Sequence, residues 1–515
     1  MNKILRKIAY MLLTFGALFI IATISINSIL KNKLEKFIQE RLPENLVRSY
    51  DDITIESFGG SLLVTNASLT IKNKEDGINH TFINVEKLKI SDISYWDYLL
   101  SDEIHVEAIS LENPKIVYYK DKLKRPKDTV RQAVARIYKP ITINRVLIKN
   151  TKLAIYEKGE DSLKIYSAGF NLEMNEVKVD NETVLQKIPF EYKDFVAKSD
   201  TVFVKVSPYE NLTVEDLSIE NGNALFKNLK LKTKYSKKEL SRIIPKERDH
   251  YDLSLEALSI DGFDFGFKQN RFFAKSEQVT LAHPSLEIYR DKLVADDPKI
   301  KPLYSKMLRD LPFELTVDSL KISDAKIIYE EREKQENTGG SINFKNMNVA
   351  ISNVSNTYDS PKNTNIKITA DFMDKTPISA EWTFDVQNKN DQFIFKAEVG
   401  PLAANRMNNF IQPNLKVKLE GHINKTYFTI DGNNKVSKTD LKINYSDFKI
   451  IVLQKDGKKK NEFLSAITDL FISKNSKKDG DYYREGTAQA TRDKTKSVFN
   501  FLWISVKNAL IKTML

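Results

Sequence analysis

The residue types that most often carry catalysis are scattered along this sequence. Its five histidines are His80, His105, His250, His283 and His422. None of them has the spacing of a metal-ligand pair or stands beside a candidate nucleophile. The sequence therefore gives no support to a metal centre or to histidine-dependent catalysis.

Carboxylates and glycines form no recognisable catalytic motif either. The acidic pairs Asp296-Asp297 and Glu330-Glu331 consist of adjacent residues, and adjacent residues on a strand point to opposite faces. The Gly-Gly at Gly59 lacks the Lys-Ser/Thr that completes a phosphate-binding loop. We predict that the protein is not an enzyme and that it has no cofactor and no metal site.

The charge balance points to an anionic partner. Lys and Arg number 80 against 69 Asp and Glu, a net charge of +11, which favours phospholipid head groups, lipopolysaccharide or nucleic acid. Because the basic residues are dispersed and not gathered in one arm, we expect membrane phospholipids and no nucleic acid. The chain has no cysteine, which excludes a disulfide framework.

An apolar segment near the N-terminus predicts a membrane anchor. Residues 8–30 contain no charged residue, and a helix of this length crosses a hydrocarbon core of about 30 Å. Lys3, Arg6 and Lys7 precede it, which favours a cytoplasmic N-terminus with the rest of the chain across the membrane. The alternative is a cleaved signal peptide, but the apolar run exceeds the usual h-region of about 7–15 residues. The anchor residues that we select are Leu12, Phe15, Leu18, Phe19 and Ile20.

The body of the chain repeats one apolar pattern. Apolar or small residues recur at relative positions 0, 2, 5, 7, 10, 12 and 14, in copies that begin at Ile104, Ile141, Leu212, Leu253 and Leu315. Steps of two predict strands. Each step of three would turn the apolar side chains to the other face, so it predicts a bulge or a tight bend.

A second likeness supports the repeat. Segments 111–121 and 281–291 share Leu, Pro, Tyr and Asp in register, and the proline should start a strand piece because it cannot donate a hydrogen bond. Short helical stretches ending near a proline precede Ile141 and Phe313. About 20 to 30 strands are expected in total.

Alternation with one apolar face fits two architectures. One is a series of closed β-sandwiches; the other is a long, curved antiparallel sheet whose apolar face lines an open groove for acyl chains. We predict the groove, although the sequence does not define which alternating face lines it. The proposed lining residues are Ile104, Val106, Ile116, Ile141, Ile143, Leu315, Val317 and Ile327.

Several segments resemble the AsmA-like group of bacterial envelope proteins, within the repeating β-groove superfamily of lipid-transfer proteins. The resemblance rests on the apolar N-terminal segment, on residues 53–71 and 83–121, and on a Leu-x-x-Pro-x-Ile-x-Tyr element at Leu111, Pro114, Ile116 and Tyr118. It implies a single-pass protein of the bacterial inner membrane, mostly periplasmic, that moves glycerophospholipid between the membranes or supports outer-membrane biogenesis. Outer-membrane proteins or envelope assembly factors would be further partners. The rival interpretation is an envelope scaffold of β-sandwiches that binds no lipid.

The C-terminus predicts a basic, amphipathic helix over residues 497–515. It lies either in a membrane interface, through Phe501, Leu502, Trp503 and Lys507, or over the last strands of the sheet. The predicted organisation is a cytoplasmic segment 1–7, an anchor 8–30, a helical extension 31–50 and a β-repeat body 51–455. A helix and flexible basic tether follow over 456–496, and then the terminal helix.

Overall fold

The computed structural model of the chain describes residues 3–40, 44–94, 97, 101, 103–124, 139–335, 338–358, 362–454, 475–476 and 482–514, without the side chains of residues 3–19 and 37. Strand accounts for 59% of the chain and helix for 15%, so the predicted mainly-β class is confirmed. The described strands number 24. The chain divides into two compact units, Met1–Val206 with Thr213–Asn221 and Ser207–Leu212 with Gly222–Leu515.

Unit 1 holds a mixed sheet. Its strands are β1 (Leu46–Ser49), β2 (Asp52–Glu56), β3 (Ser61–Lys72), β4 (Asn79–Ile93), β5 (Ile104–Glu112), β6 (Lys115–Tyr119), β7 (Ile141–Tyr156), β8 (Leu163–Val179) and β9 (Asp194–Lys205). Both β1 and β2 pair with β3, and the order then runs through β4, the β5–β6 pair, β7, β8 and β9. Neighbours are antiparallel, except that β5 and β6 run parallel to β7. The division between the units falls within β10 (Glu210–Glu220).

Unit 2 contains the remaining strands. They are β11 (Asn223–Thr233), β12 (Asp249–Asp261), β13 (Asp264–Lys268), β14 (Arg271–Ala282), β15 (Ser285–Asp291), β16 (Glu314–Arg332), β17 (Gly340–Ser355), β18 (Asn363–Phe372), β19 (Thr376–Asp385), β20 (Phe393–Val399), β21 (Leu402–Ala403), β22 (Val417–Gly432), β23 (Val436–Val452) and β24 (Arg484–Thr491). β12 pairs with β11 on one side and with β14 and β15 on the other, and β13 pairs with β14. β14 and β15 run parallel to β16, and the order then follows the sequence to β24, with β20 and β21 both pairing with β22. The sheet is therefore mixed where we expected an antiparallel one.

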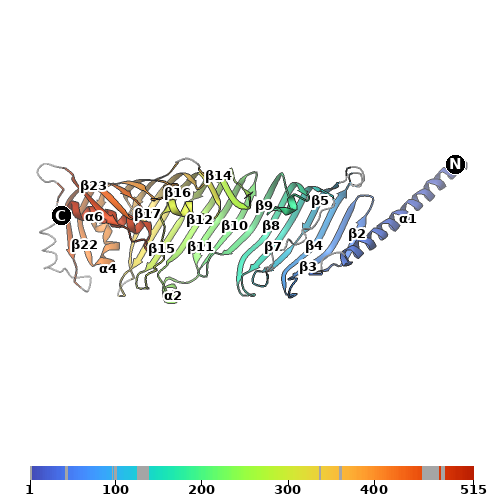
Figure 1. Cartoon of the computed structure of the whole chain (residues 1–515), viewed down its shortest axis with the longest axis horizontal. Coiled ribbons are helices and arrows are strands. Elements are labelled where there is room, and N and C mark those ends of the chain that lie inside the picture. Colours follow the sequence, from blue (N-terminus) through green and yellow to red (C-terminus); the bar gives the residue numbers. More distant parts are fainter. Residues whose placement is uncertain are drawn as a thin grey trace. The chain divides into compact units, whose positions relative to one another are not determined.

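Helices make up a small part of the fold. They are α1 (Lys3–Glu40), α2 (Lys237–Ile243), α3 (Tyr304–Arg309), α4 (Asn408–Leu415) and α6 (Val498–Met514), with short 3-10 turns at Thr183–Leu185 and Ala404–Met407. In Figure 1, α6 lies across the strands near β22, and it packs against β22, β23 and β24. α3 lies in the connection between β15 and β16, where we expected a short helix before Phe313. The corresponding connection before Ile141 falls mostly on residues outside the described part.

The sequence repeat coincides with these strands. The copy that begins at Ile104 forms β5 and β6, and the copy that begins at Ile141 forms β7. The two copies pair in parallel with equivalent positions opposite each other, from Ile104 with Ile141 to Tyr118 with Ile155. Since the same spacing occurs in both partners, their apolar side chains change face at the same rows and the register between them is preserved.

The second three-residue step of each copy is a bend in the backbone. Position nine of every copy has a positive φ: Asn113 (53°), Asn150 (55°), Asn221 (50°), Gly262 (62°) and Asp324 (52°). Asn, Asp and Gly are the residue types that tolerate this left-handed conformation. The register shifts between Ile148 and Thr151 in β7 and between Ile322 and Ala325 in β16. The predicted bulge at this step is thus confirmed.

The first three-residue step is also a shared distortion. In the β5–β7 ladder the pairing passes from Val106 to Ala108 and omits Glu107 and its neighbour Asn144. In the antiparallel partner β8, Glu176 opposite this gap has a φ of 50°. Because neighbouring strands carry the extra residue at the same row, the apolar side chains on both sides of it remain on one face.

A sixth copy follows the same spacing and was missed in the sequence. It consists of Ala274, Ser276, Val279, Leu281, Pro284, Leu286 and Ile288, in β14 and β15, and it pairs in parallel with the copy in β16. His283, at its position nine, has a φ of 49°. We recognised only its second half, within segment 281–291, because the small residues Ala274 and Ser276 at the first two positions weaken the apolar signal. The two prolines start strand pieces as predicted: β6 follows Pro114 and β15 follows Pro284.

The structure bears on two expectations at the chain ends. Residues 8–30 are helical within α1, and among residues with described side chains there is no helix with the length and hydrophobicity needed to cross a membrane. The prediction of a flexible tether up to residue 496 is wrong for Arg484–Thr491, which form β24 and pair with β23. Most of residues 456–481, including the helix expected there, lie outside the described part.

Candidate ligand-binding face

Unit 1 carries rows of apolar side chains across one face of its sheet. Two neighbouring rows each cross seven strands, from β2 to β9. The first row is Ile53, Val64, Leu88, Leu111, Ile148, Leu172 and Ala197, and the second is Ile55, Leu62, Ile90, Ile109, Val146, Met174 and Phe195. We call the face that bears these rows the apolar face of unit 1.

Most of this face is only partly buried. Its hydrophobic cluster has three buried members, Val106, Ile143 and Val177, and they are surrounded by partly buried residues. Phe190 and Tyr192, from the segment before β9, pack against the same cluster. The cluster thus consists of one run of hydrogen-bonded strands and a loop, which differs from two facing sheets of a closed sandwich.

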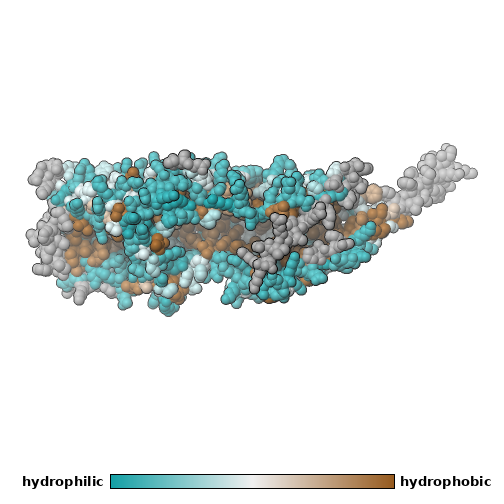
Figure 2. Space-filling view, viewed as in Figure 1, coloured by the Kyte–Doolittle hydropathy of each residue, from teal (hydrophilic) through white to brown (hydrophobic). Residues whose placement is uncertain are grey.

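Unit 2 has an apolar face of the same kind. Two rows cross its sheet from β11 to β24. The first is Ala224, Ile260, Val279, Leu320, Ile351, Ile366, Trp382, Phe395, Ile430, Thr439 and Ala488, and the second is Phe226, Leu258, Leu281, Ile322, Val349, Ile368, Ala380, Ala397, Phe428, Leu441 and Gly486. Figure 2 shows apolar side chains over β11 to β16 in a hollow with hydrophilic residues on both sides.

Burial changes along these rows. Leu258, Leu281 and Leu320 are partly exposed, whereas Trp382 and Ile430 are buried, at 4% and 0% exposure. The buried part is covered by α6, whose Phe501 and Leu502 belong to the same cluster as Trp382 and Ile430. Only the part of the face before this helix is therefore available to a ligand.

Small residues allow α6 to lie close to the sheet. Gly486, Ala488 and Ala490 alternate along β24, and a Cβ atom on Gly486 would lie 2.3 Å from the Thr513 hydroxyl. Ala509 of the helix has no exposed surface, and the hydroxyls of Ser437 and Ser505 are 2.7 Å apart in the interface. This contact has the close fit of a permanent core.

A second segment covers the apolar face beside α6. Residues 292–313 connect β15 to its parallel neighbour β16, and a parallel pair needs a crossover over one face of the sheet. Leu303 is buried in the cluster of Trp382, and the Tyr304 ring lies 5.2 Å from the Trp382 ring. We call residues 292–313 and α6 together the cover.

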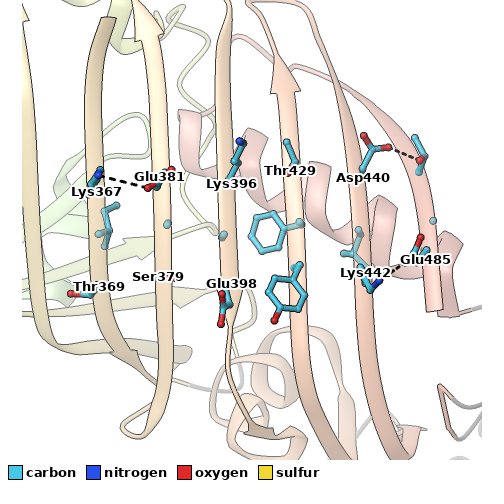
Figure 3. Close-up of a pocket in the computed structure, with 18 residues that line it drawn as sticks. Lys367, Thr369, Ser379, Glu381, Lys396, Glu398, Thr429, Asp440, Lys442 and Glu485 are labelled. Atoms are coloured by element: carbon cyan, nitrogen blue, oxygen red, sulfur yellow. Dashed lines mark hydrogen bonds and ion pairs between the residues drawn. The ribbon is translucent and has the colours of Figure 1, made fainter. Parts of the chain in front are cut away.

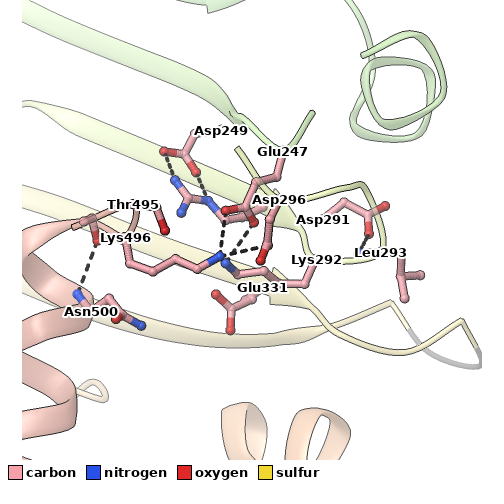
Figure 4. A network of polar contacts seen from close by, with 12 residues as sticks. Glu247, Asp249, Asp291, Lys292, Leu293, Asp296, Glu331, Thr495, Lys496 and Asn500 are labelled. Atoms are coloured by element: carbon pink, nitrogen blue, oxygen red, sulfur yellow. Dashed lines mark hydrogen bonds and ion pairs between the residues drawn. The ribbon is translucent and has the colours of Figure 1, made fainter. Parts of the chain in front are cut away.

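A polar network fixes the two parts of the cover to each other and to the sheet (Figure 4). The Lys496 amino group, just before α6, lies 3.3 Å from Glu247 and 2.8 Å from Asp296. Glu247, whose side chain has no exposed surface, also pairs with Lys292 at 2.9 Å. Burial opposes the charging of Glu247, but the hydrogen bond and positive charge of Lys292 outweigh it, so its pKa lies below the ordinary value.

Backbone hydrogen bonds reinforce this attachment. The Lys301 amide donates to the Lys494 carbonyl over 2.8 Å, and the Arg492 guanidinium donates to the Lys301 carbonyl. At the other end of the crossover, Arg309 pairs with Asp391 at 2.7 Å. The cover is thus bound on several sides.

The opposite face of the same strands has a shallow hollow of about 740 Å³ across β18 to β24. Figure 3 shows that charged side chains from neighbouring strands line it. Lys367 lies 4.0 Å from Glu381, and Lys442 lies 2.7 Å from Glu485. Because these charges pair with one another across the strands, the hollow has the character of a solvated outer face, and we do not assign it a ligand.

The predicted lining residues fall into two groups. In unit 1, Ile104 is opposite Ile141 and Val106 is opposite Ile143, and all four belong to the cluster of the apolar face. Ile116 lies on β6 opposite Leu153 of β7. In unit 2, Leu315, Val317 and Ile327 lie on β16, and Val317 is 9% exposed. Their role in binding lipid stays a prediction.

The structure separates the C-terminal residues that we had grouped. Phe501 and Leu502 are 2% and 8% exposed and pack against the sheet, so their assignment to a membrane interface is wrong. Trp503 is 44% exposed, and Lys507 is exposed as well. Of the anchor residues, Ile20 is 59% exposed; the side chains of Leu12, Phe15, Leu18 and Phe19 are outside the described part.

Sequence reasoning did not find the longer rows, although their signal is present. Residues such as Leu88 and Met174 lie in ordinary alternating strands outside the selected copies. Within the described part of the chain, His, Asp and Glu residues form no group that could hold a metal ion. The chain matches no protein-family model and no curated protein.

Proposed function

We propose that this protein binds the acyl chains of membrane phospholipids along its apolar faces and moves lipid within a bacterial envelope. In this proposal residues 8–30 of α1 anchor the chain in the inner membrane, and the body lies in the periplasm. The observation that carries the proposal is the pair of apolar rows in each unit. In unit 1, where no cover is described, most row members are partly exposed, and Ile53, Val64 and Ala197 are the buried ones.

Partial exposure of so many aliphatic side chains is costly in water. Each Å² of apolar surface that a ligand covers contributes about 25 cal/mol, and large continuous apolar patches mark ligand or membrane contacts. With about 4.8 Å between strands, the seven-stranded rows of unit 1 extend about 29 Å. One leaflet of a bilayer is about 15 Å thick in its hydrocarbon part, so these rows have room for the acyl chains of a whole lipid.

The rival proposal is an envelope scaffold that binds no lipid. It requires that the apolar face be closed by other parts of the protein, as it is beneath the cover of unit 2. In unit 1 the described residues that pack around Val106, Ile143 and Val177 come from the sheet itself and from the short segment that holds Phe190 and Tyr192; α1 packs against β2, at the edge of the face. This difference favours lipid binding over a closed core.

Site-specific photocrosslinking of the full chain in cells tests the proposal. A benzophenone amino acid replaces Val146, on the apolar face of β7, or Lys149, an exposed residue of the same strand. After growth with radioactive phosphate and irradiation, we expect labelled phospholipid on the protein with the probe at Val146 and little label with the probe at Lys149. Equal labelling at both positions, or none at either, would favour the scaffold.

A further inference from the structure

The outer side of the cover is apolar, although its inner side already forms a core. Along α6, Phe499, Trp503 and Ile511 recur at intervals of four or eight residues and are 63%, 44% and 51% exposed. Such spacing places them on one side of a helix. Phe501 and Leu502 point to the sheet, so α6 is apolar on two sides, and its outer side has no described partner that explains it.

The crossover adds to this surface. Ile300 lies just before α3 and is 66% exposed, and Met307 lies within α3 and is 49% exposed. Tyr304, one turn from Met307, has its ring 6.5 Å from the ring of Phe499. The exposed apolar residues of the two segments therefore lie on neighbouring elements. Single exposed apolar residues are common and need no explanation, but a group of five, Ile300, Met307, Phe499, Trp503 and Ile511, indicates a contact surface.

The charge of α6 identifies the kind of partner. The helix contains Lys507 and Lys512 and no Asp or Glu, and Lys507 lies in the same row as Phe499, Trp503 and Ile511. A second copy of the chain would bring the lysines of both helices together with no acid on either helix to balance them. An anionic lipid surface offers negative charge and an apolar layer at once.

We propose that the outer side of the cover, formed by Ile300, Met307, Phe499, Trp503, Lys507 and Ile511, binds the surface of an anionic phospholipid bilayer. Phe499, Trp503 and Ile511 enter the boundary between head groups and acyl chains, and Lys507 contacts the head groups. This contact is separate from the apolar faces and from α1, so it does not depend on lipid binding along the sheet.

Quenching of Trp503 fluorescence by brominated lipids tests the proposal on the full chain. The chain has three tryptophans; Trp96 is replaced by Phe, and Trp382 is buried at 4% exposure, which leaves Trp503 as the accessible fluorophore. The protein is reconstituted with vesicles of brominated phosphatidylcholine and phosphatidylglycerol. Because the readout is local to residue 503, attachment of the vesicle through α1 does not produce the signal.

The expected result is strong quenching of Trp503 that grows with the phosphatidylglycerol fraction. The variant Lys507→Gln should need about fivefold more anionic lipid for half quenching, since each basic residue near such a surface contributes about a factor of five. Phe499→Asp should abolish quenching. The control Val436→Asp changes an exposed residue, 48% accessible, outside the cover, and should leave quenching unaltered.

Two results would overturn the proposal. One is a Trp503 that stays unquenched at high phosphatidylglycerol content while the unfolding midpoint of the protein is normal, which would make a protein partner the better explanation of the surface. The other is equal quenching in the lysine variant and the parent. Photocrosslinking at Val146 is independent of both, so failure here is distinguishable from failure of the proposed lipid binding along the sheet.

Discussion

At the scale of single residues, the bends of the strands depend on side chains that tolerate a positive φ. Asn150 has a φ of 55°, and its side-chain amide donates a 2.6 Å hydrogen bond to the Asn113 side chain in the neighbouring copy. Asn113 in turn donates to Glu86 at 2.6 Å. Polar side chains thus connect the bends of adjacent strands along the outside of the sheet.

Replacing Asn150 by Val should therefore destabilise unit 1. A β-branched residue at this φ is strained by about 1–3 kcal/mol, and the variant also loses the hydrogen bond to Asn113. Asn150→Gly keeps the backbone conformation accessible and should cost clearly less. The shift in urea midpoint of the two variants, measured on the full chain, checks this, and a Gly variant as unstable as the Val variant would refute the role of φ.

Glu247 is the residue on which the attachment of the cover is expected to depend most. In the folded protein the pKa of Glu247 lies below the ordinary value of a glutamate. Its contribution to the stability of the cover is therefore complete above that ordinary pKa and is lost as the pH falls through the lower folded pKa. The charged groups around it are Lys292, Lys496, Arg290 and, through Lys496, Asp296. Acid should thus loosen the cover from about pH 4.5 downward.

Hydrogen exchange of the α6 amides, corrected for the intrinsic rate at each pH, measures this loosening. Glu247→Gln should weaken protection by about 2 kcal/mol at neutral pH, where a charged hydrogen bond is lost, and should show less further change on acidification than the parent. If parent and variant lose protection in parallel as the pH falls, Glu247 is not the group that titrates.

At the scale of elements, α6 combines a buried and an exposed aromatic side that can be separated by mutation. Phe501 is 2% exposed and its ring lies 6.2 Å from that of Phe393. Phe501→Ala should cost about 3–5 kcal/mol, because it opens a cavity between helix and sheet. Phe499→Ala, in the same helix at 63% exposure, should change stability by less than about 0.5 kcal/mol. Unfolding midpoints of the two variants decide; similar losses would contradict the orientation of the helix.

The elements also explain how far the sequence could predict the fold. The alternation of apolar residues predicts the strands and, through its three-residue steps, their bends, because both are local properties of the backbone. Asn and Gly at position nine of the copies, as in Asn113 and Gly262, were an additional local signal that we did not use.

Properties that depend on contacts between distant segments were not predictable in this way. The parallel pairing of β14 with β16 and the burial of Leu303 arise from the path of a crossover, for which the sequence has no local pattern. Whether the apolar side of α6 that holds Phe501 and Leu502 meets the sheet or a membrane was ambiguous, because such a side fits either. The sequence therefore predicted the alternating apolar face, but only the structure shows which part of that face is covered by other segments.

At the scale of the molecule, the apolar face of unit 2 is continuous in register but divided in accessibility. The row that begins at Phe226 in β11 passes through Phe428 in β22. Phe428 packs against the clusters beneath α6, whereas Phe226 lies in the part before the cover. Two residues of the same type, on the same row, thus differ in what covers them.

A benzophenone probe in place of each phenylalanine should report this division. The probe is similar in kind to the side chain it replaces, so we expect phospholipid crosslinks at position 226 and crosslinks within the protein, to α6, at position 428. Adding Phe501→Ala, which weakens the helix contact, should raise lipid labelling at position 428 and leave position 226 unchanged. Lipid labelling at position 428 in the parent chain would mean that α6 leaves the sheet in the cell, and that the covered strands belong to the binding face as well.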